Sequence, residues 1–358
     1  MLMKSLAKKL PLLVLALAFP LAGCGDKKDD NADRRKKTRP KSTDPSIFPL
    51  TAGKYEVLGI LTDQTDRARA QQLAEDTINK YGDIKCMVGL WAYNPPAILN
   101  AVKGANKLGD IKIIGFDEEA QTLDGIAAGH IHATVVQDPY MFGFRSVEFL
   151  SAIARGQNVD VPENKIMEVP FQVIGKNAVA EFRAMVRKRM DGEGEAADPL
   201  GEYDTSKPVK IAYVTNGPAS FWDLASEGVK KANEAFNAQG ETISPPNGTV
   251  DEQIRMINEK LTAGIDGIAI SPIDPANQSA FINEVAGKVP LITQDSDAPG
   301  TKRLFYLGTS NYNAGRAVGK QIKEVLPDGG KIMIFVGKME VLNAQERSQG
   351  VIDELLEP

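Results

Sequence analysis

Cysteine and aromatic residues are scarce in this sequence. Only Cys24 and Cys86 among its 358 residues are cysteine, and 6% of the residues are aromatic. Two thiols in such different surroundings cannot form a disulfide framework, and there is no Cys-x-x-Cys spacing to indicate a zinc site. We therefore expect a core without covalent cross-links, in which Cys86 is a small buried residue of an apolar strand.

The sequence also lacks an excess of positive charge and the motifs of common catalytic sites. Lys and Arg number 42 against 47 Asp and Glu, which gives a formal net charge of -5. Nucleic acid is not expected as a partner, because binding to phosphates needs a basic surface. His130 and His132 have no neighbouring thiol and no His-Glu-x-x-His motif, so no metal site is expected. Because Gly-x-Ser-x-Gly and phosphate-binding Gly-Lys-Ser/Thr motifs are missing too, we expect no enzyme, no catalytic residue and no cofactor.

The first 24 residues have the composition of an export signal. Three lysines precede a short apolar run over residues 10–21, which is too short to span a bilayer comfortably. Residues 21–24, Leu-Ala-Gly-Cys, resemble a bacterial lipobox. We therefore expect 1–24 to be a lipoprotein signal peptide, with Cys24 lipidated and the protein membrane-anchored in the periplasm or at the cell surface. The alternative is an ordinary signal peptide with a coincidental cysteine.

Two segments have compositions that are typical of unfolded chain. Residues 25–52 are rich in Asp, Lys, Arg, Pro and Ser and cannot bury enough apolar surface to fold, so they are predicted to form a disordered tether. The basic run at 34–37 is interpreted as a solvated spacer or a contact with acidic lipid headgroups. Residues 191–206 begin Asp-Gly-Glu-Gly-Glu and show no periodicity, which predicts a flexible linker.

Short β-branched runs alternate with amphipathic stretches on both sides of this linker. Before it, strands are predicted at 57–61, 86–90, 111–116 and 132–136, and helices at 66–80, 95–107, 121–128 and 139–155. After it, strands are predicted at 210–215, 267–270, 291–293 and 331–336, and helices at 221–238, 251–263, 277–286, 313–326 and 341–357. Nearly continuous apolar strands that alternate with helices indicate an α/β fold, with parallel sheets covered on both faces.

Several of these segments resemble the type I periplasmic sugar-binding proteins, the ribose- and galactose-binding family. Segments that resemble the family's first half are 210–216 with Phe221 and Trp222, 264–272, 289–297, 308–311 and 343–347. Segments that resemble its second half are 91–97 (Trp-Ala-Tyr-Asn-Pro-Pro-Ala), 115–117 (Gly-Phe-Asp) and 133–140. The halves stand in swapped order, so the chain resembles a circularly permuted member of the family.

The resemblance implies two Rossmann-like lobes joined by a hinge, each built from discontinuous segments. Lobe 1 is expected from 138–167 and 207–310. Lobe 2 is expected from 53–137, 168–190 and 311–358. The linker would then connect the ends that the family leaves free.

The resemblance also implies a set of residues that bind the ligand in the cleft between the lobes. Asp117 and Asp295, each just after a strand, match carboxylates that accept hydrogen bonds from ligand hydroxyls; alternatively they cap the following helices. Asn94 and Gln137 match amide ligands, with turn or hinge roles as the alternative.

Aromatic and neutral polar residues complete this set. Phe221 and Trp222 match an aromatic pair, and Trp91 and Tyr93 are candidates for further stacking surface, with packing as the alternative for all four. Asn343 and Gln345 lie at a helix start from which the family supplies an arginine.

Two departures from the family pattern concern arginines. Gln345 stands in place of that family arginine and Ser296 in place of a second one, while Arg347 is interpreted as a structural cation on a helix face. These departures favour a neutral ligand.

The predicted function is that of a solute-binding lipoprotein. It would capture a small neutral polar ligand, with a sugar as the expected class, by hinge closure and deliver it to the permease of an ABC transporter. A monomer is expected. One alternative is a sensor that presents its ligand to a chemoreceptor or sensor kinase, and another is a binder of polyols or nucleosides. The effector domain of a transcriptional regulator is disfavoured, because no helix-turn-helix pattern occurs near the start.

Overall fold

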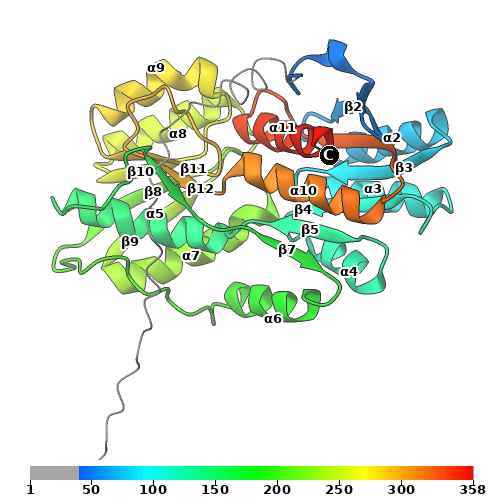
Figure 1. Cartoon of the computed structure of the whole chain (residues 1–358). Coiled ribbons are helices and arrows are strands. Elements are labelled where there is room, and N and C mark those ends of the chain that lie inside the picture. The colour runs from blue at the N-terminus through cyan, green and yellow to red at the C-terminus, as the bar shows by residue number, and fades with distance from the viewer. Residues whose placement is uncertain (1–39, 358) are drawn as a thin grey trace, which may run out of the picture. The chain divides into compact units, whose positions relative to one another are not determined.

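The computed structural model describes residues 40–357 (Figure 1). The expected signal peptide, Cys24 and residues 25–39 of the expected tether lie outside the described residues. Within 40–357, no helix is long and apolar enough to cross a membrane. Cys86 is a free, fully buried thiol, as expected, and burial raises its pKa to about 12.

The strands form two separate sheets. The seven-stranded sheet has the order β1 (Leu50–Ala52), β2 (Tyr55–Thr62), β13 (Gly330–Val336), β3 (Ile84–Gly89), β4 (Lys112–Phe116), β5 (Ala133–Val136) and β7 (Gln172–Gly175). The six-stranded sheet has the order β6 (Ile166–Glu168), β12 (Tyr306–Gly308), β11 (Leu291–Gln294), β10 (Gly267–Ile270), β8 (Val209–Val214) and β9 (Ala238–Ile243). All pairings are parallel except those of β1 and β7 at the edges of the larger sheet. The predicted α/β fold with parallel sheets is confirmed.

Helices cover both faces of each sheet. They are α2 (Arg67–Lys80), α3 (Asn94–Gly104), α4 (Ala120–Ala128), α5 (Pro139–Ala154), α6 (Val179–Met190), α7 (Ser220–Phe236), α8 (Val250–Thr262), α9 (Pro275–Ala286), α10 (Asn311–Val325) and α11 (Leu342–Leu356). We call the six-stranded sheet with α5, α7, α8 and α9 lobe 1, and the seven-stranded sheet with the other helices lobe 2. Central strands such as β5 and β10 are buried along their whole length, because helices pack on either side.

The chain passes between the lobes at several places. It crosses from β5 to α5, from β6 to β7 and from β12 to α10, and residues 191–206 connect α6 of lobe 2 to β8 of lobe 1 (Figure 1). These residues have no helix or strand, but they are bound to α5: the hydroxyl of Tyr140 donates to the carbonyl of Glu195, and the amide of Leu200 donates to Glu148. The connection thus follows the surface of lobe 1.

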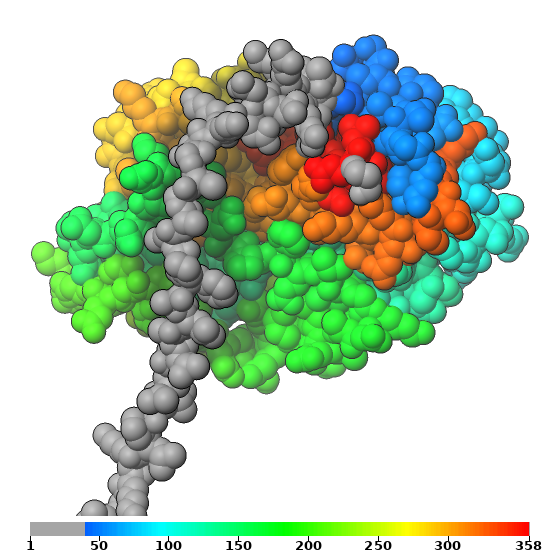
Figure 2. Space-filling model, in the orientation of Figure 1, coloured from blue at the N-terminus to red at the C-terminus, as the bar shows by residue number. Residues whose placement is uncertain are grey.

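The expectation of disorder is wrong for residues 40–52. They contain a 3₁₀ turn, η1 (Pro45–Ile47), and β1, which pairs with β2. The amide of Ser42 donates to the side chain of Gln349, and its hydroxyl donates to the carbonyl of Gln345, both on α11. Figure 2 shows these first described residues, in blue, beside α11, in red. The composition of this segment predicted disorder because composition does not report contacts with a distant part of the chain such as α11.

The predicted strands and helices are present within a few residues, but some elements were missed. The helix predicted at 221–238 ends at Phe236, because Asn237 has a left-handed backbone with φ of 47° and strand β9 follows. The side chain of Asn233 binds both the amide and the carbonyl of Gly240, which fixes this turn. Strands β1, β6, β7 and β12 and helix α6 were also missed, and each of these strands is only three or four residues long.

The close packing of α10 on α11 depends on glycine. A Cβ atom at Gly315 would lie 2.1 Å from the carbonyl oxygen of Arg347, which is part of the backbone and cannot move away without shifting α11. We predict that Gly315→Ala lowers the free energy of unfolding by about 1–3 kcal/mol, the usual cost of overpacking. Urea denaturation would measure this loss. The control is Gly104→Ala in α3, where a Cβ atom meets nothing within 4 Å and helix propensity favours alanine. Equal effects of the two substitutions would contradict the prediction.

Candidate ligand-binding site

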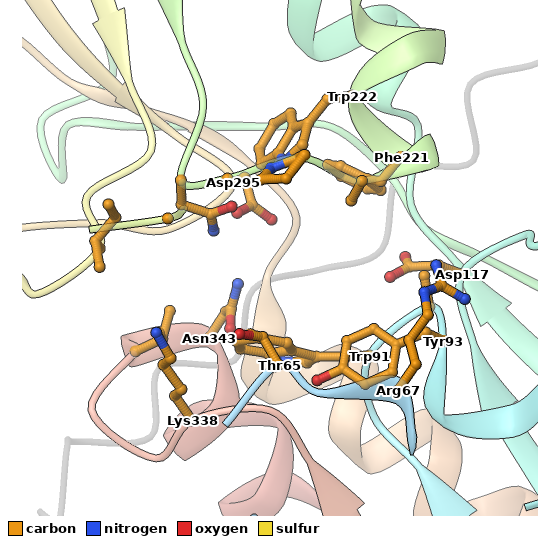
Figure 3. A pocket seen from close by; sticks show the side chains of 18 of the residues that line it. Thr65, Arg67, Trp91, Tyr93, Asp117, Phe221, Trp222, Asp295, Lys338 and Asn343 are labelled. Atoms are coloured by element: carbon orange, nitrogen blue, oxygen red, sulfur yellow. The ribbon is translucent and has the colours of Figure 1, made fainter. Parts of the chain in front are cut away.

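A cavity of about 340 Å³ lies between the two lobes. Its size is within the range of about 300–1,000 Å³ that is usual for small-molecule sites. Both lobes line it, and Figure 3 shows Trp222 and Asp295 of lobe 1 facing Trp91 and Asn343 of lobe 2 across the space. Eight of the ten predicted ligand-binding residues line this cavity: Trp91, Tyr93, Asp117, Gln137, Phe221, Trp222, Asp295 and Asn343.

The two predicted aspartates hold equivalent places in the two lobes. Asp117 follows β4, and Asp295 follows β11, so each lies beyond the carboxyl end of a parallel strand. Both have left-handed backbones, with φ of 63° and 58°. This region is sparsely populated by non-glycine residues, but Asp tolerates it better than most. The turn places each carboxylate in the cavity wall.

Hydrogen bonds fix the orientation of both carboxyl groups. The side-chain amide of Gln137 donates to Oδ1 of Asp117 at 3.0 Å, and the hydroxyl of Ser271 donates to Oδ2 of Asp295 at 2.9 Å. The hydroxyl of Tyr306 donates to the carbonyl of Asp295. Gln137 therefore positions Asp117 as well as lining the cavity.

Burial dominates the electrostatics of these two groups. It raises the pKa of Asp117 to about 6; Arg347 and the hydrogen bond from Gln137 oppose this rise, and the negative charge of Asp295 adds to it. Burial also raises the pKa of Asp295, against the opposing effects of Arg347 and Ser271. Each carboxylate is thus less stabilised in the protein than it would be in water.

The structure corrects the interpretation of Arg347. This side chain is 2% exposed and lines the cavity, so it is not only a structural cation on a helix face. Its Nε donates to Asn311, its Nη1 donates to the carbonyl of Leu90, and its guanidinium lies 3.9 Å from the ring centroid of Phe116. Its Nη2 lies 4.0 Å from Oδ1 of Asp295 and has no hydrogen-bond partner among the described residues. Arg347 therefore places a cationic donor in the cavity wall, although the arginine that the family supplies from this helix is replaced by Gln345.

Two predicted residues, Asn94 and Gln345, do not line the cavity. The side chain of Asn94 is fully buried, where it accepts from the amide of Trp91 and donates to Asp63 at 2.7 Å. The side chain of Gln345 donates to the carbonyl of Met339 at 2.8 Å. Each residue instead supports a loop that carries cavity residues.

Helical geometry explains the error at Gln345. Residues four apart share a helix face, and residues two apart point to nearly opposite sides. On α11, Asn343 and Arg347 therefore both face the cavity, and Gln345 between them faces outward.

Asp63 organises one wall of the cavity, and the sequence analysis did not single it out. Its fully buried carboxylate accepts hydrogen bonds from the hydroxyl of Tyr93, the side chain of Asn94 and the amide of Thr65. Burial raises its pKa, and these three bonds oppose the rise. Tyr93 and Thr65 both line the cavity. The signal available in the sequence was an acid two residues after the end of the first predicted strand, 57–61.

Aromatic rings cover much of the remaining surface. Phe221 and Trp222 pack edge to face, with ring centroids 4.7 Å apart, and Trp91 and Tyr93 pack similarly at 6.4 Å. The ring of Trp91 lies against Gly337, where a Cβ atom would be 2.1 Å from the ring. The rings are thus held in place by packing before any ligand binds.

Four buried polar atoms of the cavity-lining residues have no hydrogen-bond partner among residues 40–357. They are Nε1 of Trp91, Oε1 of Gln137, Oδ1 of Asn343 and Nη2 of Arg347. Buried polar atoms are nearly always paired in folded proteins, so a cluster of unpaired donors and acceptors at one cavity indicates a place for a polar ligand. Other polar lining residues that were not predicted are Thr65, Arg67, Asn216, Asn247 and Lys338.

Comparison with known proteins gives matches to one family. The family model described as periplasmic binding protein domain matches residues 1–158 and 211–358. Among curated proteins, the chain is 27% identical over 111 residues to a ribose import binding protein of Haemophilus influenzae, with 31% of this chain and 37% of that protein covered. It is 26% identical over 165 residues to a D-ribose/D-allose-binding protein of Pseudomonas aeruginosa, with 42% and 51% covered. The matches thus span about half or less of these relatives' lengths.

Solved structures give partial matches of similar extent. A solute-binding protein of an ABC transporter from Burkholderia graminis, in complex with D-arabinose, has a TM-score of 0.41 at 25% identity over 43% of this chain and 53% of that chain. A glucose-galactose binding protein from Geobacillus stearothermophilus also has a TM-score of 0.41, at 28% identity over 42% and 55%.

The raised pKa of Asp117 makes the stability of the unliganded protein depend on pH. The pKa of Asp117 is about 6 in the folded protein and lower in the unfolded chain. At pH values between these two pKa values the folded state binds more protons than the unfolded state, so the free energy of unfolding falls as the pH rises through this range. Asp117→Asn keeps the acceptor for Gln137 and tolerates the left-handed backbone. We predict that the variant has a higher free energy of unfolding than the wild type above pH 7. The difference should be at most about 3 kcal/mol, because each pKa unit corresponds to about 1.4 kcal/mol, and it should vanish near pH 4.

Urea denaturation across this pH range would measure the difference. Asp76→Asn on the exposed side of α2 is the control and should show no such pH-dependent gain. A difference between Asp117→Asn and the wild type that does not change with pH would contradict the assignment of the penalty to Asp117.

Proposed function

The chain belongs to the periplasmic binding protein family and has its type I fold, and from this premise we propose that it captures a small sugar between its lobes for import by an ABC transporter. The observation that carries the proposal is the cavity wall itself. It combines two buried carboxylates, four unpaired buried polar atoms and packed aromatic rings from both lobes. The ribose import binding protein among the curated relatives supports the same role.

The chemistry of a sugar matches these groups. Its hydroxyls donate to the carboxylates of Asp117 and Asp295 and accept from Nη2 of Arg347 and Nε1 of Trp91, since each hydroxyl both donates and accepts. Its C–H faces pack on aromatic rings such as Trp222. Bonds to the two carboxylates are charge-assisted and are therefore among the stronger ones available.

The charges of the cavity favour a neutral ligand. The carboxylates of Asp117 and Asp295 are balanced by the cations of Arg347 and Lys338, which line the same space. Arg67, the remaining cation of the wall, is paired with Glu119. The charges of the cavity wall are therefore already balanced, and a ligand without net charge keeps this balance.

Binding is coupled to closure of the lobes in this proposal. A ligand that touches Asp295 on lobe 1 and Asp117 on lobe 2 makes all its contacts only when the lobes are together, so it favours the closed state. The closed monomer then docks on the permease. Lipidation of Cys24 and a tether before residue 40 would hold the protein at the membrane, in keeping with the periplasmic location of the family.

We further propose that the chain is a circular permutation of its family. The family model matches two stretches, which are separated by a gap that contains residues 191–206. Strands β13 and β2 are parallel neighbours, and α11 follows β13, so joining α11 to β2 would create an ordinary strand-helix-strand unit. The side chain of Gln349 on α11 donates to the carbonyl of Pro40 at 3.0 Å. The beginning and the end of the described chain therefore lie next to each other.

We predict that a panel of D-ribose, D-xylose, L-arabinose, D-galactose, D-glucose and D-fructose contains at least one sugar that raises the melting temperature. Asp295→Asn should weaken the binding of that sugar by about 10- to 100-fold, which corresponds to one charge-assisted hydrogen bond of about 1.5–3 kcal/mol. Isothermal titration would measure the loss, with Asp76→Asn as the control. If no sugar raises the melting temperature, the proposed function is wrong.

We predict that a rearranged chain with the family order binds the same sugar. This chain begins at Lys207, joins Glu357 to Lys54 through a short glycine-rich linker and ends at Arg189. Its fold should persist, because every strand pairing except that of β1 is retained and permutation is tolerated at surface connections. Circular dichroism and sugar titration would check it; an unfolded product would count against the permutation.

A further inference from the structure

A second cavity, of about 500 Å³, lies next to the first. It is formed by α4 and α6 of lobe 2 and α7 of lobe 1. Ala92 and Phe221 line both cavities, so these two side chains are shared between them. A ligand that fills the first cavity and contacts Ala92 and Phe221 therefore lies next to the second cavity.

The second cavity differs from the first in being lined largely by apolar side chains. Leu123, Val186, Met190 and Leu224 line it together with Phe221. Met190 is 41% exposed, which is high for an apolar side chain of its size.

The cations of this lining are already paired. Arg183 pairs with Asp124 at 2.7 Å, and Arg187 lies 3.7 Å from Asp191. Ser220 and Asp223 also line the cavity, from exposed positions. The lining therefore combines an apolar surface with polar groups that lie mostly at exposed positions.

Glu118 is the polar group that stands out in this lining. Its Oε2 is buried and has no hydrogen-bond partner among the described residues. Burial raises the pKa of this carboxyl group well above its usual value; the charges of Asp117 and Asp138 add to the rise, and Arg189 opposes it. Glu118 therefore brings to this lining a buried polar atom without a partner among residues 40–357, and its carboxyl group can form a hydrogen bond with a ligand.

We propose that the second cavity binds the aromatic aglycone of a glycoside whose sugar ring occupies the first cavity. This inference rests on the proposed function and names its substrate class. The sugar ring binds at Asp117, and Glu118 is the next residue in the chain, so the glycosidic substituent extends past Ala92 and Phe221 toward Glu118. The Oε2 atom of Glu118 forms a hydrogen bond with a polar group on the aglycone.

The lining favours an aromatic substituent over a second sugar ring. A second ring would bring several hydroxyls against a largely apolar lining, in which Oε2 of Glu118 is the one buried polar atom without a partner among residues 40–357. Each hydroxyl buried without a partner costs free energy. An aromatic ring instead buries apolar area against Leu224, Met190 and Phe221. It needs at most one or two polar partners.

Titration with matched glycosides tests the proposal. The probes are the 4-nitrophenyl and methyl glycosides of each of the six sugars in the panel, in both anomers, and cellobiose and lactose as disaccharides. For the sugar that binds, the 4-nitrophenyl glycoside should bind at least about tenfold more tightly than the methyl glycoside, because it buries an additional ring. Disaccharides should show no such gain.

Two pairs of variants locate the effect. Ala184 lines the second cavity from an exposed position on α6, so Ala184→Trp should fill the cavity and abolish the tenfold gain without changing the affinity for the free sugar. Ala180→Trp, also exposed on α6 but lining neither cavity, should keep the gain. Glu118→Gln retains a polar side chain of the same length and should keep most of the gain, whereas Glu118→Leu should reduce it several-fold.

The outcomes separate this inference from the proposed function. If free sugars bind but the 4-nitrophenyl glycosides bind no more tightly than the methyl glycosides, the inference is overturned and the proposed function stands. A gain that survives Ala184→Trp, or a larger gain with disaccharides, overturns it as well. If no free sugar and no glycoside binds, both fail together.

Discussion

Two carboxylates buried in one cavity wall, those of Asp117 and Asp295, are the constraint on which the rest of the site depends. A single buried guanidinium, that of Arg347, lowers the pKa of both, yet burial still raises each one. The unliganded cavity therefore keeps charged groups with too few partners, a costly arrangement inside a protein. In the proposed function, hydroxyl groups of a sugar would supply the missing donors. The same residues thus lower the stability of the unliganded protein and provide groups for ligand binding, as is common at functional sites.

The scaffold holds these carboxylates by the same means in both lobes. Each ends a buried parallel strand and then turns through a left-handed backbone, with φ of 63° at Asp117 and 58° at Asp295. Such a conformation persists only where the surroundings impose it. The side chains of Gln137 and Ser271 bind the two carboxyl groups, so each lobe presents an oriented acceptor before the lobes close. In the proposed closure, only the distance between two preformed half-sites would have to change.

Much of this could be predicted from the sequence, because strands buried on both faces and amphipathic helices leave periodic patterns. The two aspartates were predicted from the family resemblance together with their places just after strands, which are local properties of the chain. Asn94, Gln345 and Arg347 were misassigned because their roles depend on which way a helix turns its side chains, and motif matching does not resolve a difference of two residues. The support that Asp63 gives to Tyr93 depends on a contact across 30 positions of the chain, which no local pattern reports.

The two faces of helix α11 make different contacts. Its inner face presents Asn343 and Arg347 to the cavity, and its outer face is held by the segment that precedes the first strand, through Ser42. Gln345, between the two cavity residues, accepts from Ser42 and donates to Met339, in the loop that carries Lys338. The cavity wall is therefore braced from behind by residues more than 300 positions away in the chain. If the protein captures its ligand by closure, as proposed, a wall braced in this way would leave the movement to the crossings between the lobes, so that ligand contacts favour closure rather than distortion of α11.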